Sequence, residues 1–155
     1  MYKKNYLKAV VIVHGKSEKQ MCEWIKQNLR LQIHIESSAK GKTSIQITSL
    51  MNTLKNTIYK NYSSFKRHFN EKLEPDLPKD KLLPDYFKIF IIMDTDDCTK
   101  EEKDNYINKK MFENHWAYDY IVPLYNSPDL ESVLIKSEVA SKNKKELKKS
   151  YAKIF

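Results

Sequence analysis

Apolar residues along the chain follow two patterns, short continuous runs and longer stretches with helical spacing. Residues 7–13 (LKAVVIV) and 86–93 (YFKIFIIM) form nearly continuous apolar runs, which are typical of strands covered on both faces. Shorter runs at 32–37 and 118–126 indicate two further strands. We expect the strand at 86–93 to be central in the sheet, because it is the most hydrophobic of these runs.

Apolar residues spaced three and four positions apart lie between these runs and predict the helices. The predicted helices cover 16–31, 44 to about 62, 99–116 and a stretch that begins at 127, with Ser17, Thr99 and Ser127 as capping residues. Residues 63–85 contain three of the five prolines and are expected to be a frayed helix end followed by a long connection. The lysine-rich residues 137–155 are expected to be a helix or tail.

Strands that alternate with helices indicate an α/β fold, in which a mainly parallel sheet of about four strands is flanked by helices. The length of 155 residues suits a single domain, so we expect 1–136 to form it and 137–155 to belong to it. In such sheets, binding sites form beyond the carboxyl ends of the strands. Polar sequences follow three of the predicted strands, namely VHGKSE, DTDD and NSPDLE, and we expect them to converge.

Acidic residues dominate these polar sequences. Asp94, Asp96 and Asp97 follow the most hydrophobic strand, where three like charges repel one another. Alternation along an extended chain points Asp94 and Asp96 to the same side, so they are the candidate ligand pair. Glu18 and Glu131 follow other strands and could approach the same edge, and four carboxylates suit one or two Mg²⁺ or Mn²⁺ ions. The competing interpretation is that these acids cap helices.

The motifs VVIVHGKSE, IIMDTDD and SPDLESVL, in this order, resemble the Toprim domain of topoisomerases, bacterial primases, OLD-family nucleases and RloB-like proteins of bacterial defence systems. The resemblance covers about residues 7–135 and implies a Toprim-like fold and metal-dependent processing of DNA or RNA phosphodiesters. It implies metal-binding or acid–base roles for Glu18, Asp94 and Asp96, and a later acid at Glu131. It also implies that a separate ATPase or regulatory protein is a partner.

The sequence departs from this family at the end of the first strand. Toprim domains usually carry a glutamate before a glycine there, and this chain has His14 before Gly15. A histidine can ligate a divalent ion or act as a general base, but it is a poorer ligand for Mg²⁺ than a carboxylate. Two interpretations stay open: an active site that uses His14 with the acids, or a degenerate module that binds nucleic acid or protein without catalysis. A flavodoxin-like or receiver-like domain is disfavoured, because receiver domains carry paired acids after the first strand.

Basic residues exceed acidic residues by eight, which favours a polyanionic partner such as nucleic acid. A solvated lysine-rich surface is the alternative, since only two of the basic residues are arginines. Lys40 and Lys42 flank Gly41 in a basic loop and are the best candidates for phosphate contacts. Lys16 is either a further contact or an ordinary surface residue.

The remaining candidates carry weaker signals. Cys22 and Cys98 fit neither a zinc spacing nor a disulfide framework, which indicates a reduced, cytoplasmic protein. No stretch approaches the length of a membrane span. His34, His68 and His115 have no carboxylate or cysteine partner at ligand spacing, so we expect each to be structural or at the surface.

Overall fold

The computed structural model describes residues 4–127 and 129–136, without the side chain of Glu131. The strands are β1 (Ala9–Val13), β2 (Ile33–Glu36), β3 (Lys88–Asp94) and β4 (Ile121–Asn126), and the α-helices are α1 (Lys16–Leu29), α2 (Ile47–Asn56), α3 (Tyr62–Phe69), α4 (Lys100–Ile107) and α5 (Leu130–Lys136). The sheet has the order β2-β1-β3-β4, and each neighbouring pair is parallel. The predicted α/β fold with four strands is confirmed, and the predicted segment 137–155 lies outside the described residues.

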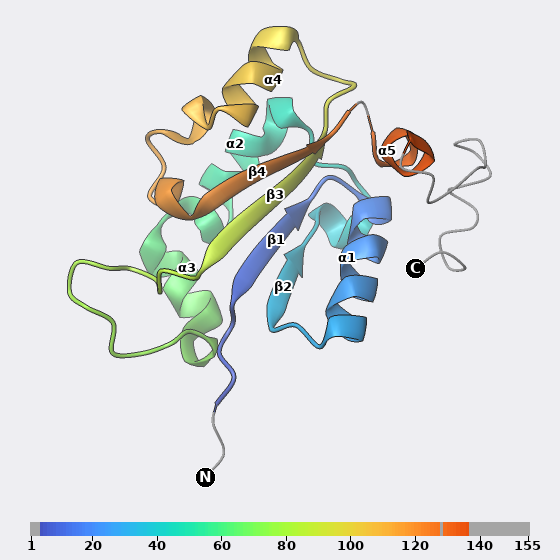
Figure 1. Ribbon diagram of the computed structural model, residues 1–155. Coiled ribbons are helices and arrows are strands. Elements are labelled where there is room, and N and C mark those ends of the chain that lie inside the picture. Colours follow the sequence, from blue (N-terminus) through green and yellow to red (C-terminus); the bar gives the residue numbers. More distant parts are fainter. Residues whose placement is uncertain (1–3, 128, 137–155) are drawn as a thin grey trace.

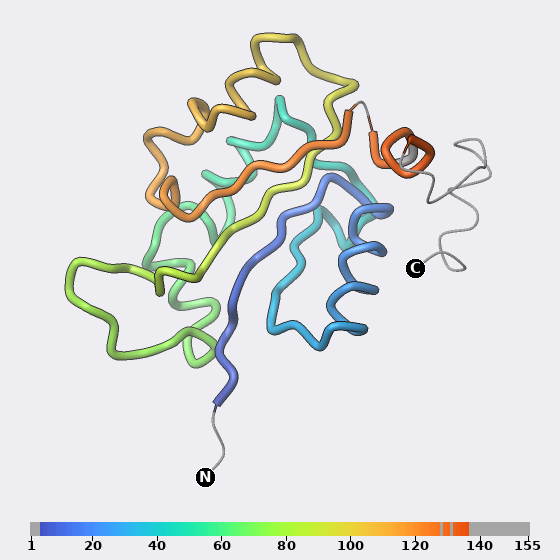
Figure 2. The backbone as a smooth tube through the Cα atoms, viewed as in Figure 1, coloured from blue at the N-terminus to red at the C-terminus, as the bar shows by residue number. Residues whose placement is uncertain are grey.

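The chain winds around the sheet in both directions from β1. α1 connects β1 to β2 across one face, whereas α2 and α3 connect β2 to β3 across the other face (Figure 1). α4 then connects β3 to β4 on the side of α2. β1 and β3 run side by side in the middle of the sheet (Figure 2), so the connections diverge at their carboxyl ends. Such a switch point is where open α/β sheets bind their ligands.

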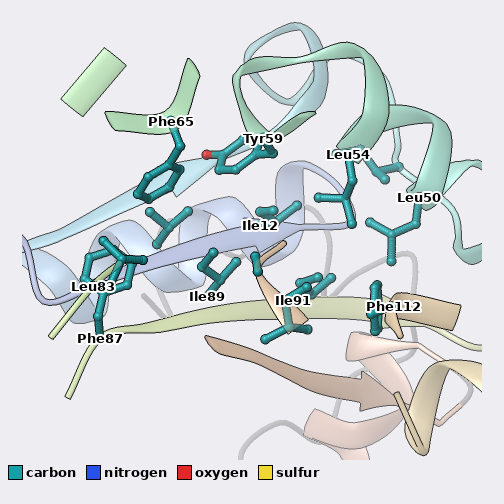
Figure 3. Packing of buried hydrophobic residues seen from close by; sticks show 14 of the residues in the cluster. Ile12, Leu50, Leu54, Tyr59, Phe65, Leu83, Phe87, Ile89, Ile91 and Phe112 are labelled. Carbon is teal, nitrogen blue, oxygen red and sulfur yellow. The ribbon is translucent and has the colours of Figure 1, made fainter. Parts of the chain in front are cut away.

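The larger hydrophobic core lies between the sheet and the helices α2 and α3. Ile12, Ile89 and Ile91 point from β1 and β3 toward this side, as the alternation of strand side chains requires (Figure 3). Leu50 and Leu54 meet them from one face of α2, and all five side chains are at most 1 % exposed. Each such burial stabilises the fold by about 2 kcal/mol before the entropy of ordering is counted.

The opposite face of the sheet is covered less completely by the described residues. Val11 packs there with Cys22 of α1. Phe90 and Ile92 of β3 are only half-buried on this face, and Leu124, the register partner of Ile92, is 42 % exposed. The expectation of burial on both faces therefore holds for β1 but only in part for β3, although β3 is central as predicted.

The prediction of a single helix from 44 to about 62 is wrong. α2 ends at Asn56 and α3 begins only at Tyr62. Between them, the side chains of Thr57 and Asn61 accept hydrogen bonds from backbone N–H groups two and three residues ahead. Such local bonds compete with the helical ladder and start a new turn. Residues 63–69, expected as a frayed end, therefore belong to a helix of their own.

Some helix termini also differ from the predicted ones. α1 begins at Lys16, so Gly15 rather than Ser17 precedes its first turn. α4 ends at Ile107, well before the predicted residue 116. Thr99 caps α4 as predicted, because its hydroxyl accepts a hydrogen bond from a first-turn backbone N–H at 3.2 Å. None of the described helices is long and apolar enough to cross a membrane.

Candidate functional site

His14 and Asp94 stand at the carboxyl ends of the two central strands. His14 follows β1 directly, and its backbone N–H donates to the carbonyl of Ile92 at 2.9 Å, which extends the pairing with β3. Asp94 is the last residue of β3. Parallel pairing therefore brings the two side chains together, and His14 Nε2 lies 3.6 Å from Asp94 Oδ2. The predicted convergence of the polar sequences after the first and third strands is confirmed.

The second ring nitrogen of His14 determines where the imidazole carries its proton. Nδ1 lies 2.7 Å from the carbonyl oxygen of Ile45. A carbonyl oxygen only accepts hydrogen bonds, so Nδ1 is the protonated nitrogen. In the neutral imidazole, Nε2 then turns a lone pair toward the carboxyl group of Asp94. A lone pair and a carboxylate attract each other only through a proton or a cation between them.

Glu18 adds a second buried carboxyl group to this edge. It lies in the first turn of α1 and is only 2 % exposed. Its Oε2 accepts a hydrogen bond from the backbone N–H of Gly15 at 3.2 Å, so part of its role is to satisfy the start of the helix. A Cβ at Gly15 would lie 3.3 Å from Ser44 Oγ, which is a tight contact. A glycine at this position therefore lets the end of β1 lie close to the loop that contains Ser44.

The charge of Glu18 acts directly on Asp94. Burial raises the pKa of Asp94 and the charge of Glu18 raises it further, whereas the charge of His14 and a hydrogen bond from Asn126 lower it by less. The net pKa lies well above the usual range of an aspartate, because two adjacent buried carboxyl groups do not both ionise readily. The pair therefore retains a proton close to neutral pH unless a cation takes its place.

The donor atoms at this edge are of the chemical types that divalent cations bind. Glu18 and Asp94 offer carboxylate oxygens, which suit Mg²⁺, and the imidazole of His14 adds a nitrogen that suits Mn²⁺ or a softer ion. A histidine that ligates a metal usually donates its other N–H to a backbone carbonyl, as His14 does to Ile45. Within the described part of the chain, however, no group of three or more His, Cys, Asp or Glu side chains is arranged so that it could hold a metal ion. An ion bound here would need further ligands from water or phosphate.

Asp96 and Asp97 do not extend the buried carboxyl pair. β3 ends at Asp94, so the strand alternation that was expected to place Asp96 beside Asp94 stops before Asp96 is reached. That basis for the pairing is therefore wrong, and both Asp96 and Asp97 are exposed in the turn that leads to α4. Glu131 lies within α5, but its side chain is outside the described residues, so its role as a ligand stays a prediction.

The predicted phosphate-binding lysines gather beside the same edge. The loop 38–41 packs on the first turn of α1, since a Cβ placed on its glycine would lie 3.5 Å from Lys16 Cα. Lys19 Nζ donates to the carbonyl of Lys40 at 3.3 Å and ties the loop to the helix. Lys16, Lys40 and Lys42 are all exposed. Two segments that are distant in sequence therefore present one group of cations.

The backbone of this loop is strained. Ala39, Lys40 and Gly41 have successive positive φ angles of 48°, 57° and 88°. Each residue other than glycine costs about 1 kcal/mol in this region. The hydroxyl of Thr43 donates to Ser38 Oγ at 2.6 Å across the base of the loop and helps to hold it. Strain of this kind occurs often at binding sites, where it persists because surrounding contacts enforce it.

Two residues that orient the site were not predicted from the sequence. Asn126 ends β4, is 8 % exposed, and donates through its amide to Asp94 Oδ1 at 3.2 Å. Asn126 could have been identified from its position, because it is the first residue of the polar sequence NSPDLE, which was expected at this edge. Ile45 gave no signal, because it contacts His14 through a backbone carbonyl that any residue could supply.

Comparisons with protein-family models, with curated proteins and with solved structures found no match to this chain. The architecture alone does not identify a function, because one α/β fold can carry many unrelated activities. The resemblance to Toprim domains therefore stays a prediction, and the chemistry of the site has to be inferred from its own residues.

Proposed function

We propose that the protein is a Toprim-like, divalent-metal-dependent enzyme that cleaves or otherwise processes nucleic-acid phosphodiesters. One observation carries the proposal: His14 Nε2 faces Asp94 Oδ2 at 3.6 Å while Nδ1 is committed to a backbone carbonyl. Together with the buried carboxyl group of Glu18, these acceptors converge at the switch point between β1 and β3. Such an excess of acceptors at a ligand-binding edge is what a cation relieves.

In this proposal, Glu18, Asp94 and His14 would contribute ligands to Mg²⁺ or Mn²⁺, and water or phosphate would complete the site, because the described side chains are not arranged to hold an ion by themselves. An ion held there would polarise the phosphodiester and lower the pKa of the attacking water. Asn126 keeps the Asp94 carboxyl group oriented through its 3.2 Å hydrogen bond, and the carbonyl of Ile45 does the same for the imidazole. A histidine that is not itself a ligand can accept a proton from water in the same position.

The lysines beside the edge are proposed to contact the phosphate backbone. Lys16, Lys40 and Lys42 are exposed next to the carboxyl pair, and the chain carries a net charge of +8. Phosphate contacts fix a nucleic acid in position without reading its sequence. Asp96 and Glu131 stay predictions as additional ligands, and so do a cytoplasmic location and a separate ATPase or regulatory partner.

A second candidate function is a catalytically degenerate module that binds nucleic acid or protein. One observation favours it: the Oε2 atom of Glu18 already accepts the Gly15 N–H, so this carboxyl group has a structural role without any metal. His14 stands where Toprim domains usually carry a glutamate. This candidate predicts binding that a chelator does not change.

Titration calorimetry of Mn²⁺ and Mg²⁺ tests the proposal. The variants are Asp94→Asn and, as a matched control, Asp97→Asn, which makes the same chemical change at an exposed position. Wild type and the control are expected to bind the ion, and Asp94→Asn is expected to bind it at least about tenfold more weakly. Because phosphate can supply missing ligands, the titration is repeated with a phosphorothioate oligonucleotide present.

Cleavage assays on single-stranded DNA, double-stranded DNA and RNA complete the test. Cleavage is expected with Mn²⁺ or Mg²⁺, and it is expected to stop with EDTA and in Asp94→Asn but not in Asp97→Asn. Cleavage that survives in Asp94→Asn would contradict the proposal. Binding of nucleic acid that neither EDTA nor Asp94→Asn changes, without cleavage, would favour the degenerate module.

A further inference from the structure

A groove starts beside the candidate site and runs between β2 and α2. It has a volume of about 470 Å³, within the range of small-molecule sites. Ile45, whose carbonyl accepts the hydrogen bond from His14, is part of its lining. Half-buried Ile58 contributes apolar surface, and the remaining lining is rich in carboxylate, amide and hydroxyl groups. The groove therefore combines an apolar surface with polar groups that can form specific hydrogen bonds with a ligand.

Glu36 is the charged group of this groove. The hydroxyl of Tyr59 donates to Glu36 Oε1 at 3.0 Å, and His34 Nε2 lies 3.5 Å from the same oxygen. Burial raises the pKa of Glu36, but the close contact with His34, the hydrogen bond from Tyr59 and the charges of His34 and His68 outweigh it, so the pKa is lowered. The contacts from Tyr59 and His34 are both made to Oε1. Among the described residues, this leaves Oε2 of the ionised carboxylate available to a ligand.

The expectation that His34 has no carboxylate partner is wrong. Glu36 follows His34 by two residues in β2, and alternation places both side chains on one face of the strand. The ring of His68 on α3 lies 6.3 Å from that of His34. The pair of His34 and Glu36 could be found from the sequence, but the contact of Glu36 with Tyr59 depends on the packing of β2 against the segment after α2.

The opposite wall of the groove offers a matched pair of amides from α2. Asn56 Nδ2 donates to Asn52 Oδ1 at 2.7 Å and to the carbonyl of Asn52 at 2.9 Å. These bonds assign the orientation of both side chains. Asn52 Nδ2 remains as a donor and Asn56 Oδ1 as an acceptor, a combination that suits the polar edge of a nucleobase.

The groove adjoins a second hollow of about 660 Å³ that carries positive charge. Asn56 and His68 line both hollows, and the second adds Lys60 and Arg67. Arg67 is exposed and is one of only two arginines in the chain. A guanidinium group binds phosphate oxygens in pairs, which makes it a stronger phosphate ligand than an isolated lysine.

We infer that this groove binds a nucleotide, with its base between Glu36 and the amides of α2 and its phosphate at Arg67 and Lys60. Cytosine, adenine and guanine carry an exocyclic amino group that donates to a carboxylate, whereas thymine and uracil carry a carbonyl oxygen in the place of the cytosine amino group, which a carboxylate repels. The groove therefore prefers a base with an amino group. The inference rests on the proposed function only in taking nucleic acid as the partner. A free nucleotide and a nucleotide within a single strand present the same chemistry here.

Fluorescence anisotropy with labelled oligo(dC) and oligo(dT) in EDTA tests the inference. Wild type is expected to bind oligo(dC) about tenfold more tightly than oligo(dT), in line with one specific base contact. Glu36→Gln keeps an acceptor for Tyr59 but removes the charge, and it is expected to bring the two affinities within about twofold. Arg67→Gln is expected to weaken both complexes equally and to reduce the salt dependence by about one unit of slope.

Two controls make the result specific. Arg30→Gln removes the other arginine, which is exposed at the end of α1 and lines neither hollow, and it is expected to change nothing. If Glu36→Gln fails to fold, as judged by its circular dichroism, Asn56→Ala at an exposed position is expected to lose the preference instead. Competition by cytidine 5′-monophosphate identifies a free nucleotide as sufficient, and its failure identifies a strand; both outcomes support the groove when the preference depends on Glu36.

Equal binding of the two oligonucleotides by wild type, or an unchanged preference in folded Glu36→Gln and Asn56→Ala, overturns the inference. The proposed function fails separately. If Asp94→Asn still cleaves while the preference for oligo(dC) depends on Glu36, the catalytic proposal is wrong and the inference about the groove is supported. If cleavage requires Asp94 but the preference for oligo(dC) does not depend on Glu36, only the inference about the groove is wrong.

Discussion

His14 Nε2 lies 3.6 Å from Asp94 Oδ2, while its Nδ1 donates to the carbonyl of Ile45 at 2.7 Å. When the imidazole is neutral, two acceptors therefore face each other where β1 and β3 end, and the charge of Glu18 acts on Asp94 at the same edge. A proton stabilises this arrangement at low pH and a cation can do so at higher pH. The stability of this edge should therefore depend on both.

Without metal, the protein is expected to be more stable near pH 5 than near pH 8. The pKa of Asp94 is raised to about 7 from an ordinary 3.8, so between these values the folded state binds more protons than the unfolded state. Stability therefore falls as the pH rises through this window, by on the order of 2 kcal/mol. Urea unfolding in EDTA at several pH values measures it. Asp94→Asn is expected to flatten the profile and Asp97→Asn to leave it unchanged; a flat wild-type profile would show that the pKa of Asp94 is not raised in the folded protein.

Replacement of His14 by glutamate is expected to favour Mg²⁺. The variant places a third carboxyl group beside Glu18 and Asp94, which supplies the oxygen ligands that Mg²⁺ prefers. In EDTA at pH 8, the added like charge is expected to lower the free energy of unfolding by about 1 kcal/mol or more. His14→Gln adds no charge and serves as the control. Calorimetry and melting temperatures with and without Mg²⁺ measure both effects, and unchanged Mg²⁺ affinity in His14→Glu would argue that residue 14 does not face the ion.

The three lysines beside the edge are expected to carry much of the salt dependence of nucleic-acid binding. Changing Lys16, Lys40 and Lys42 together to glutamine should reduce the slope of log affinity against log salt by about two to three units. The control changes three exposed lysines outside the loop and α1, namely Lys66, Lys79 and Lys110. Anisotropy at a series of salt concentrations gives both slopes. Equal losses in the two triple variants would mean that the cations act through net charge and not through this site.

Tyr106→Phe is expected to destabilise the sheet next to the site by about 1 to 2 kcal/mol. The buried hydroxyl of Tyr106 lies 2.7 Å from the carbonyl of Ile91 and 2.6 Å from that of Leu124, so it joins β3 to β4. Its single proton can be donated to either carbonyl, so its removal takes away the only donor that this side chain offers them. Tyr125→Phe, at a position that is 46 % exposed, is expected to change stability by less than about 0.5 kcal/mol. Chemical denaturation of both variants measures the difference, and equal effects would rule out a role for the Tyr106 hydroxyl.

The sequence alone determined the fold class and the edge where the site lies. Continuous apolar runs identify strands because both faces of β1 are buried, and helical spacing identifies the covering helices. The polar sequences after the first and third strands could be assigned to one edge because parallel strands end together. Glu18, Asp94 and the departure at His14 were visible for the same reason. These inferences depend only on local periodicity and on the general geometry of parallel sheets.

Only the tertiary structure decided which side chains meet at that edge. Glu18, and not Asp96, acts on Asp94, because β3 ends at Asp94 and because α1 starts directly after Gly15. The proton position on His14 depends on the Ile45 carbonyl, a contact that a backbone makes without any residue signature. Strand ends, register and backbone contacts are set by the packing of the whole chain, so local sequence patterns do not contain them.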